Sequence, residues 1–242
     1  MPRFFVSEAV GDTVKITGDD ARHIARSLRM AVGDTVTVSD GEGRDFECRL
    51  TKIRDEECEC DVLSSSESAG EPPVEITLFM AYPKGDKLET VVQKAVELGA
   101  CRIIPFESSR CIKRPDRDKA QKIRARLSRI AEEAAKQCGR GRLPEVLDAI
   151  SLSALLSYAS EFDLTLFCYE GDGTSSLKTV LKKAKTPRKI AVIVGCEGGF
   201  SLEEAEKIVA SGAVAVNLGP RILRCETAPS YVLSALSYYF EL

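Results

Sequence analysis

The sequence predicts an α/β protein in which a small N-terminal β-barrel precedes a larger domain with a mainly parallel sheet. Two observations predict this division. The first 63 residues alternate polar and apolar side chains in short runs between Gly/Asp turns, which is typical of antiparallel strands. After a Ser- and Pro-containing segment, apolar strand-like runs alternate with helical patterns, which indicates parallel strands covered by helices on both faces.

The N-terminal strands are expected at residues 10–16, 34–39, 45–50 and 58–63, with one helix from about Asp20 to Met30. Residues 64–73, Ser-Ser-Ser-Glu-Ser-Ala-Gly-Glu-Pro-Pro, have the composition of a linker. The predicted domains are therefore residues 1–70 and 73–242.

The second domain opens with an apolar strand at 74–81 and a helix that ends at Gly99, preceded by an Asp86-to-Glu89 capping box. Further strands are expected at 102–106, 163–168, 189–195 and 213–218. The remaining helices are a long basic one at 117–138, one that starts at a Ser201-to-Glu204 capping box, and a final one with Pro229 in its first turn.

Composition is that of an ordinary globular protein, with 44% hydrophobic and 29% charged residues. The sequence has no apolar run of membrane-spanning length and no signal peptide, so we expect a cytoplasmic protein with no membrane partner. Nine scattered cysteines, an odd number, argue against a disulfide framework. Cys58 and Cys60 lack a nearby histidine, since the only one is His23, and no metal site is expected.

Charge is unevenly distributed along the chain. The net charge is −3, yet the segment from Arg110 to Arg142 carries an excess of eight positive charges. This asymmetry indicates a surface that faces a polyanion on an otherwise acidic protein, although a solvated helix face would produce the same pattern.

Two glycine-bearing loops follow predicted strands, at residues 193–201 and 217–229. Ligands bind outside the carboxyl ends of parallel strands, and glycine lets the backbone approach a ligand closely. The first loop matches no phosphate-binding motif, and Glu197 would repel a pyrophosphate. A nucleotide with a cationic centre and no phosphate, such as S-adenosylmethionine, suits it better; alternatively, the glycines only shape tight turns. No G-x-S-x-G motif supports a hydrolase.

These loops, Val194-Gly-Cys-Glu-Gly-Gly-Phe-Ser and Leu218-Gly-Pro-Arg-Ile-Leu-Arg-Cys-Glu-Thr-Ala, resemble the signature of the ribosomal RNA small subunit methyltransferase E family of the SPOUT class. Further matches begin at His23, Lys84, Gln93 and Glu133, so the resemblance covers the chain in order. It implies a PUA-like RNA-binding barrel, a trefoil-knotted SPOUT methyltransferase domain and a homodimer. It also implies methyl transfer from S-adenosylmethionine to N3 of one uridine in 16S rRNA of the small ribosomal subunit.

The chain departs from the family pattern at three cysteines. Cys196 replaces the usual Pro, Cys225 the usual Thr, and Cys138 a common Ser. The glycines and the Arg224/Glu226 pair are retained, so the departures concern fine catalytic roles.

The resemblance implies a cofactor site, and the chemistry of uracil N3 methylation points to a catalytic pair beside it. Arg224 and Glu226 are the expected catalytic residues: Arg224 would stabilise the uracil anion or, alternatively, pair with Glu226. The cofactor-binding residues would be Phe167, Cys168, Tyr169, Val194, Gly195, Cys196, Glu197, Gly198, Gly199, Leu218, Gly219, Ile222, Leu223, Arg224 and Thr227.

RNA contacts are expected from clustered arginines and one lysine, because guanidinium groups suit phosphate contact and base stacking. The expected residues are Arg3, Arg22, Arg26, Arg29, Arg110, Lys113, Arg114, Arg140 and Arg142. Two alternatives stay open: a SPOUT methyltransferase that acts on a ribose 2′-hydroxyl or on tRNA, and a non-catalytic RNA-binding assembly factor.

Overall fold

The computed structural model describes residues 1–6, 11–112, 114, 117–184 and 186–242. The chain forms two compact units, one of residues 1–71 with 135–143 and the other of residues 72–134 with 144–242. The sequence predicted one boundary between residues 70 and 73. In the structure, residues 135–143 also belong to the first unit. No change in amino-acid composition at these residues predicts this.

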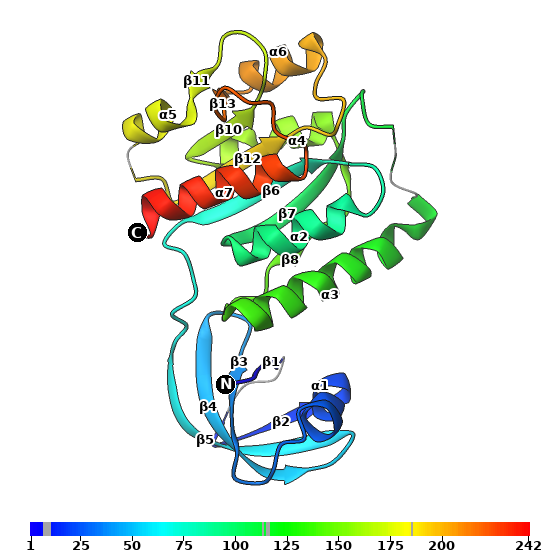
Figure 1. The fold of residues 1–242 in the computed structure, drawn as a ribbon, viewed down its shortest axis with the longest axis vertical. Helices are drawn as coiled ribbons and strands as arrows, with labels where there is room; N and C mark the ends of the chain where they lie inside the picture. The colour runs from blue at the N-terminus through cyan, green and yellow to red at the C-terminus, as the bar shows by residue number, and fades with distance from the viewer. Residues whose placement is uncertain (7–10, 113, 115–116, 185) are drawn as a thin grey trace. The chain divides into compact units, whose positions relative to one another are not determined.

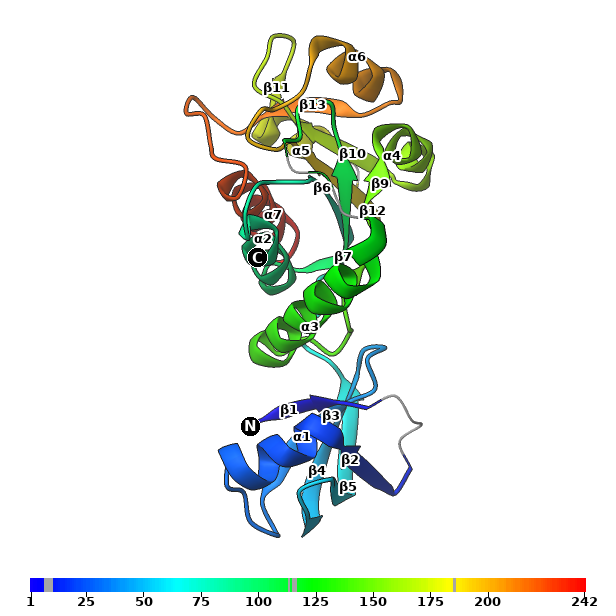
Figure 2. The ribbon, with the colours of Figure 1, turned by 90° about the vertical axis from the view of Figure 1, so that its right-hand side faces the viewer.

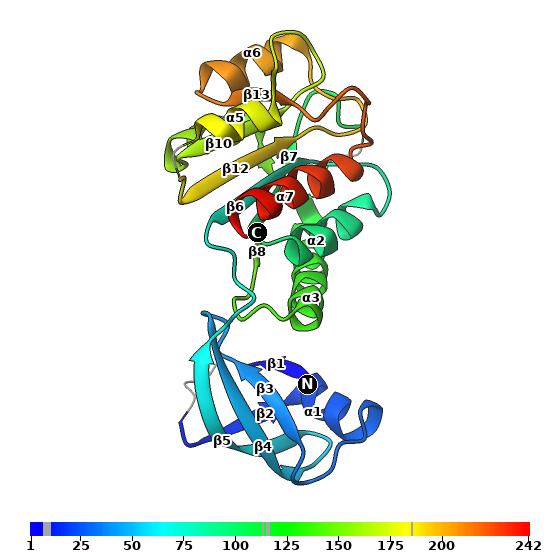
Figure 3. The ribbon, with the colours of Figure 1, turned by 60° about the vertical axis from the view of Figure 1, so that its left-hand side comes forward.

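The first unit is a curled five-stranded sheet with a short helix beside it (Figures 1 and 3). The strand order is β1-β3-β4-β5-β2; only the β1–β3 pair is parallel. Alternate residues such as Val14, Ile16, Val36 and Val38 are buried in its core. The strands are β1 (Arg3–Phe5), β2 (Thr13–Thr17), β3 (Thr35–Ser39), β4 (Arg44–Ile53) and β5 (Glu57–Glu67).

Two expectations for this unit need correction. The single helix expected from Asp20 to Met30 is instead a short α1 (Gly18–Arg22) continued by a π-helical turn, η1 (His23–Ser27). Strand β5 also runs four residues into the predicted linker, because Ser64 to Glu67 pair with β4 as far as Arg44. Polar composition alone did not distinguish an exposed strand end from a linker.

Residues 135–143 join the first unit through Glu71. Its carboxylate accepts hydrogen bonds from Arg140 Nη2 (2.8 Å) and from the backbone N–H groups of Gly141 and Arg142 (3.0 Å each). Arg140 is only 2% exposed. A Cβ atom on Gly70 would lie 2.4 Å from the Gly139 carbonyl oxygen, so the two backbone segments need glycine to approach.

The second unit is built on an eight-stranded sheet in which every strand pair is parallel, with the order β11-β13-β10-β12-β6-β7-β8 and β9 beside β7. Helices α2 and α7 lie side by side on one face, and α4 lies on the opposite face (Figure 2). The strands are β6 (Glu75–Ala81), β7 (Ala100–Glu107), β8 (Glu145–Val146), β9 (Ile150–Ser151), β10 (Leu164–Cys168), β11 (Ser175–Ser176), β12 (Lys189–Val194) and β13 (Val214–Asn217).

The longer strands are almost fully buried, as expected for a parallel sheet covered on both faces. The Ser201 capping box is present at the start of α6, whereas the expected Asp86 side-chain cap of α2 is absent. The helices of this unit and the helical segments between them are α2 (Lys87–Glu97), η2 (Arg117–Lys119), α3 (Ala120–Cys138, whose end belongs to the first unit), α4 (Leu152–Tyr158), η3 (Ala159–Glu161), α5 (Leu177–Lys183), α6 (Leu202–Ala210) and α7 (Thr227–Phe240).

Candidate functional site

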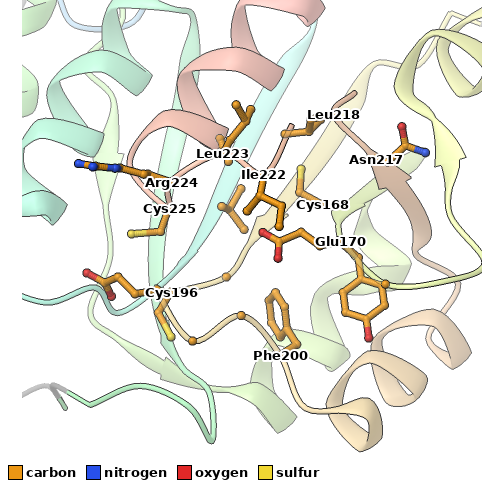
Figure 4. A pocket seen from close by; sticks show the side chains of 18 of the residues that line it. Cys168, Glu170, Cys196, Phe200, Asn217, Leu218, Ile222, Leu223, Arg224 and Cys225 are labelled. Carbon is orange, nitrogen blue, oxygen red and sulfur yellow. The ribbon is translucent and has the colours of Figure 1, made fainter. Parts of the chain in front are cut away.

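A pocket of about 890 Å³ lies in the second unit, where the loops that follow β10, β12 and β13 meet (Figure 4). These strands are neighbours in the parallel sheet, so the loops at their carboxyl ends converge. Ile222 lies in the pocket wall with 81% of its surface exposed. An exposed isoleucine here favours a ligand with an apolar surface that would cover it.

The loop after β12 forms the floor of the pocket. Its turn is closed by a hydrogen bond from Gly199 N–H to the Cys196 carbonyl (2.9 Å), and Gly199 has a φ of 63°. A Cβ on Gly195 would lie 2.8 Å from the Phe200 ring. That ring is fixed edge-on against Phe167, with centroids 4.9 Å apart. The glycines therefore keep this loop tight and its backbone open to a ligand.

Lys87, at the start of α2, forms ion pairs with two different segments that line the pocket. Its Nζ lies 3.0 Å from Glu197 Oε1 and 3.1 Å from Glu226 Oε2. Glu197 also accepts a hydrogen bond from the Lys84 backbone N–H (3.2 Å). Glu197 follows β12 and Glu226 immediately precedes α7. The Lys87 ammonium group therefore links these two segments, which are distant in the sequence.

Hydrogen bonds and ion pairs determine the protonation states of Lys87, Glu197 and Glu226. Burial raises the pKa of Glu197, but hydrogen bonds from its own backbone N–H and from Lys87 outweigh burial and lower it. The Glu226 backbone N–H, followed by Lys87, lowers the pKa of Glu226. The two carboxylates in turn raise the pKa of Lys87. All three groups are therefore charged at neutral pH.

The two unusual cysteines line the pocket in different surroundings. Burial, followed by the Glu226 carboxylate, raises the pKa of Cys225 to about 12, and its thiol donates to Glu226 (3.2 Å). A hydrogen bond with Cys111 lowers the pKa of Cys196, against the effect of burial. Cys225 thus retains the donor ability of a hydroxyl.

Comparison with known proteins identifies the chain. An RNA methyltransferase domain matches residues 70–237, and an RNA methyltransferase PUA domain matches residues 16–63. The ribosomal RNA small subunit methyltransferase E of Bacillus subtilis is 36% identical over 95% of this chain and 91% of its own length. The chain belongs to the ribosomal RNA small subunit methyltransferase E family.

A solved structure of this family agrees with the fold. The enzyme from Neisseria gonorrhoeae, bound to S-adenosyl methionine, is 32% identical and has a TM-score of 0.89, with 99% of this chain and 98% of that chain covered. The family relative from Aquifex aeolicus is 32% identical over 96% of this chain and 97% of its own length. The expected fold class, a PUA-like N-terminal domain before an α/β methyltransferase domain with a mainly parallel sheet, is confirmed.

Most residues predicted to bind the family's cofactor lie together in the pocket, with two exceptions. Phe167 is fully buried beneath the pocket, where it stacks on Tyr169, and Thr227 lies outside the lining. The predicted residues in the lining are Cys168, Tyr169, Val194, Gly195, Cys196, Glu197, Gly198, Gly199, Leu218, Gly219, Ile222, Leu223, Arg224 and, from the catalytic pair, Glu226.

The alternative role considered for Arg224, an ion pair with Glu226, is not seen, because Glu226 pairs with Lys87 instead. Arg224 is exposed at one side of the pocket, and no other side chain that the structure describes pairs with its guanidinium group (Figure 4). Lys87, Arg110 and Glu170 also line the pocket but were not predicted to do so. For Lys87 the nearest signal was the family match at Lys84-Gly-Asp-Lys, which contains it, and Arg110 had been predicted to contact RNA.

The predicted RNA-binding residues of the first unit are mostly paired with acidic side chains. Arg3 binds Asp45, Arg22 binds Asp19, and Arg26 binds Asp55. Arg22, Arg26 and Arg29 are spaced as on one face of an α-helix, but Arg26 lies in the π-helical turn, and Arg29 follows it with a φ of 52°, so the three do not share such a face. Arg140 is a correction: it is buried against Glu71 and offers no surface to RNA.

Of the remaining predicted RNA contacts, Arg114 and Arg142 are exposed, and Lys113 lies outside the described residues. Arg110 lines the pocket and donates to the Gly198 carbonyl (3.0 Å). Within the described part of the chain, no group of His, Cys, Asp and Glu side chains is arranged to hold a metal ion. None of the described helices combines the length and apolarity needed to span a membrane.

Proposed function

We propose that this protein is an S-adenosylmethionine-dependent methyltransferase that modifies N3 of one uridine in 16S rRNA of the small ribosomal subunit. The observation that carries the proposal is the pocket of three converging loops, in a chain that aligns from end to end with a family structure bound to S-adenosyl methionine. The pocket volume falls within the usual range for small-molecule sites, about 300–1,000 Å³.

The residues present fit this cofactor. Glycines 195, 198 and 199 expose backbone on the floor, and Leu218, Ile222 and Leu223 supply an apolar wall for a purine. When bound, the cofactor supplies an electrophilic methyl group on a sulfonium. The protein has to hold the uracil base in line with that methyl group and favour the N3 anion.

Arg224 is the residue that we assign to the uracil anion. Its exposed guanidinium, with no partner among the described side chains, is free to approach a uracil carbonyl oxygen beside the pocket. A fixed cation there would stabilise the negative charge that develops when N3–H is lost. Glu226, engaged by Lys87, would act indirectly by holding the loop that carries Arg224.

An Arg224→Ala variant tests this role. We expect unchanged binding of S-adenosylhomocysteine and a methylation rate lower by about 10²-fold or more, because a transition-state contact is removed. Arg221→Ala, which changes another exposed arginine of the same loop, is the matched control. Wild-type methylation by folded Arg224→Ala protein contradicts the assignment.

The acceptor is tested by methylation of assembled small subunits and of naked rRNA, followed by mapping of the modified nucleoside. 3-Methyluridine in 16S rRNA supports the proposal, whereas a 2′-O-methylated nucleoside or methylated tRNA supports another SPOUT activity. Failure to bind S-adenosylmethionine in calorimetry supports a non-catalytic assembly factor. The proposal also includes a trefoil knot in the second unit, a homodimer and a cytoplasmic location, as the family resemblance implies.

A further inference from the structure

Glu170 is a carboxylate of the pocket to which the family motifs assign no role. It follows β10 and extends into the pocket between Ile222 and Phe200 (Figure 4). The preceding residue, Tyr169, is held by two contacts. Tyr169 donates its backbone N–H to the Val216 carbonyl (3.0 Å), and its ring stacks on Phe167 with centroids 5.1 Å apart.

The loop geometry presents Glu170 to the pocket and requires a glycine after it. A Cβ on residue 171 would lie 2.5 Å from the Tyr169 ring, so Gly171 allows the chain to turn tightly over that ring. The carboxylate is therefore carried by a backbone that is positioned before any ligand arrives, which lowers the entropy lost on binding.

Glu170 differs from the other two carboxylates that line the pocket. Glu197 and Glu226 are both engaged by Lys87. For Glu170, no residue in the described ranges provides a hydrogen bond or an ion pair. A ligand that fills the pocket removes water from this carboxylate and must replace the lost hydrogen bonds with donors of its own.

The pocket is polarised along its length. Lys87 pairs with Glu197 and Glu226, and its Nζ lies 3.9 Å from Cys225 Sγ. In Figure 4, Cys225 and Arg224 lie on one side of the pocket, whereas Glu170 lies on the other, near Ile222 and Phe200. S-adenosylmethionine is polarised in the same way, with a charged amino-acid end and a nucleoside end. If the charged end of the cofactor lies at the charged side of the pocket, its amino-acid end is beside Lys87 and its nucleoside is beside Glu170.

We propose that Glu170 accepts hydrogen bonds from the ribose hydroxyls of the cofactor and selects a ribonucleoside over its 2′-deoxy analogue. A vicinal diol presents two O–H donors, which suit the two acceptor oxygens of one carboxylate. The inference rests on the proposed function, because it assumes that the pocket binds S-adenosylmethionine.

The test is calorimetry on the full-length protein with two ligands. S-adenosylhomocysteine contains the amino-acid end, whereas 5′-methylthioadenosine retains the nucleoside and lacks that end. We expect Glu170→Gln to weaken both by the same factor, about tenfold. Glu206→Gln, which changes an exposed glutamate on α6 outside the pocket, should leave both affinities unchanged.

A second comparison uses 5′-methylthioadenosine and its 2′-deoxy analogue. The wild-type protein should prefer the ribonucleoside, and Glu170→Gln should remove most of that preference. Weakening of S-adenosylhomocysteine alone would overturn the inference and assign Glu170 to the ammonium group. Equal affinities in wild-type and variant would also overturn it. If the wild-type protein binds neither ligand, the proposed function falls together with the inference.

Discussion

Lys87 shows how one side chain can determine the shape of a binding pocket. Its ammonium group is shared between Glu197 and Glu226, which come from different walls. Without this cation, two carboxylates would face each other beside the cofactor, and their repulsion would separate the loops. The sequence did not assign Lys87 to the pocket, because its partners lie more than a hundred residues away and no local pattern connects them.

We predict that Lys87→Met weakens binding of S-adenosylhomocysteine roughly tenfold, a loss comparable to that of one charged contact. Lys94→Met is the matched control, because Lys94 lies on the same helix and pairs with Glu97 away from the pocket. Calorimetry on both variants measures the difference. If Lys87→Met binds as tightly as the control, the cluster does not shape the pocket.

Prediction from sequence succeeded best for residues within the two glycine loops. These segments have a local signature, namely glycines directly after buried strands, and most of the predicted residues lie in the pocket. Phe167 and Glu170 illustrate the limit. Both are near the end of β10, but only the three-dimensional path of the loop determines that Phe167 packs beneath the pocket while Glu170 points into it.

At the scale of an element, the loop after β12 depends on glycine at a position that a sequence pattern cannot distinguish from an ordinary turn. A Cβ on Gly198 would lie 2.9 Å from Arg110 Cβ and 3.1 Å from the Arg110 carbonyl oxygen. Rotation of the Arg110 side chain moves neither its Cβ nor its carbonyl oxygen, so the contact cannot be relieved in that way. The loop and the segment after β7 must therefore separate if any side chain is added.

We predict that Gly198→Ala lowers the free energy of unfolding by about 1–3 kcal/mol, the usual cost of overpacking. It should also weaken S-adenosylhomocysteine binding, because the displaced loop is the pocket floor. Gly11→Ala serves as the control, since a Cβ there meets no atom within 4 Å. Chemical denaturation and calorimetry give the two values, and an unchanged Gly198→Ala protein would show that the loop adapts without cost.

The start of α6 is fixed by Glu204, which is 7% exposed. Its carboxylate completes the capping box with Ser201 and accepts hydrogen bonds from the Ser109 backbone N–H (2.6 Å) and hydroxyl (2.8 Å). Burial raises the pKa of Glu204, but these hydrogen bonds outweigh burial and lower it. The sequence identified the capping box but not its second role, because Ser109 belongs to another loop.

A lowered pKa makes the contribution of Glu204 dependent on pH. The folded-state pKa lies below the unfolded value of about 4.3, so the stabilisation is present above that value and is lost as the pH falls through the folded-state pKa. We predict that Glu204→Gln lowers the free energy of unfolding at pH 7 by about 1–3 kcal/mol. The difference from wild type should shrink in urea titrations at progressively more acidic pH. A difference that does not vary with pH would contradict this account.

Other elements show where local patterns fail. The Asp86 spacing suited a capping box, yet the Asp86 side chain makes no cap. Helices α4 and α5 were not predicted, since each has only seven residues and short apolar periods carry little information. Long buried strands such as β6 and β12 were predicted within two residues of their ends, because continuous apolar runs are specific to covered parallel sheets.

At the scale of the whole molecule, the ion pair of Glu71 and Arg140 joins residues 135–143 to the first unit. We predict that Arg140→Ala lowers the free energy of unfolding of this unit by about 3–5 kcal/mol, since it leaves a largely buried carboxylate without its cation. Arg142→Ala, which retains the backbone hydrogen bond to Glu71, should change stability little. Thermal unfolding compares the two, and equal melting temperatures would show that the pair is dispensable.

The first unit is built from two separate segments of the chain, and this has a consequence for its synthesis on the ribosome. Domains usually fold in the order in which they are translated, at about 5–20 residues per second. Here the first unit lacks residues 135–143 until the chain has been extended well beyond its own strands. At that rate, several seconds pass between the synthesis of the curled sheet and the synthesis of Arg140, which pairs with Glu71. A nascent chain released before residue 143 would carry a complete set of barrel strands but an unfinished first unit.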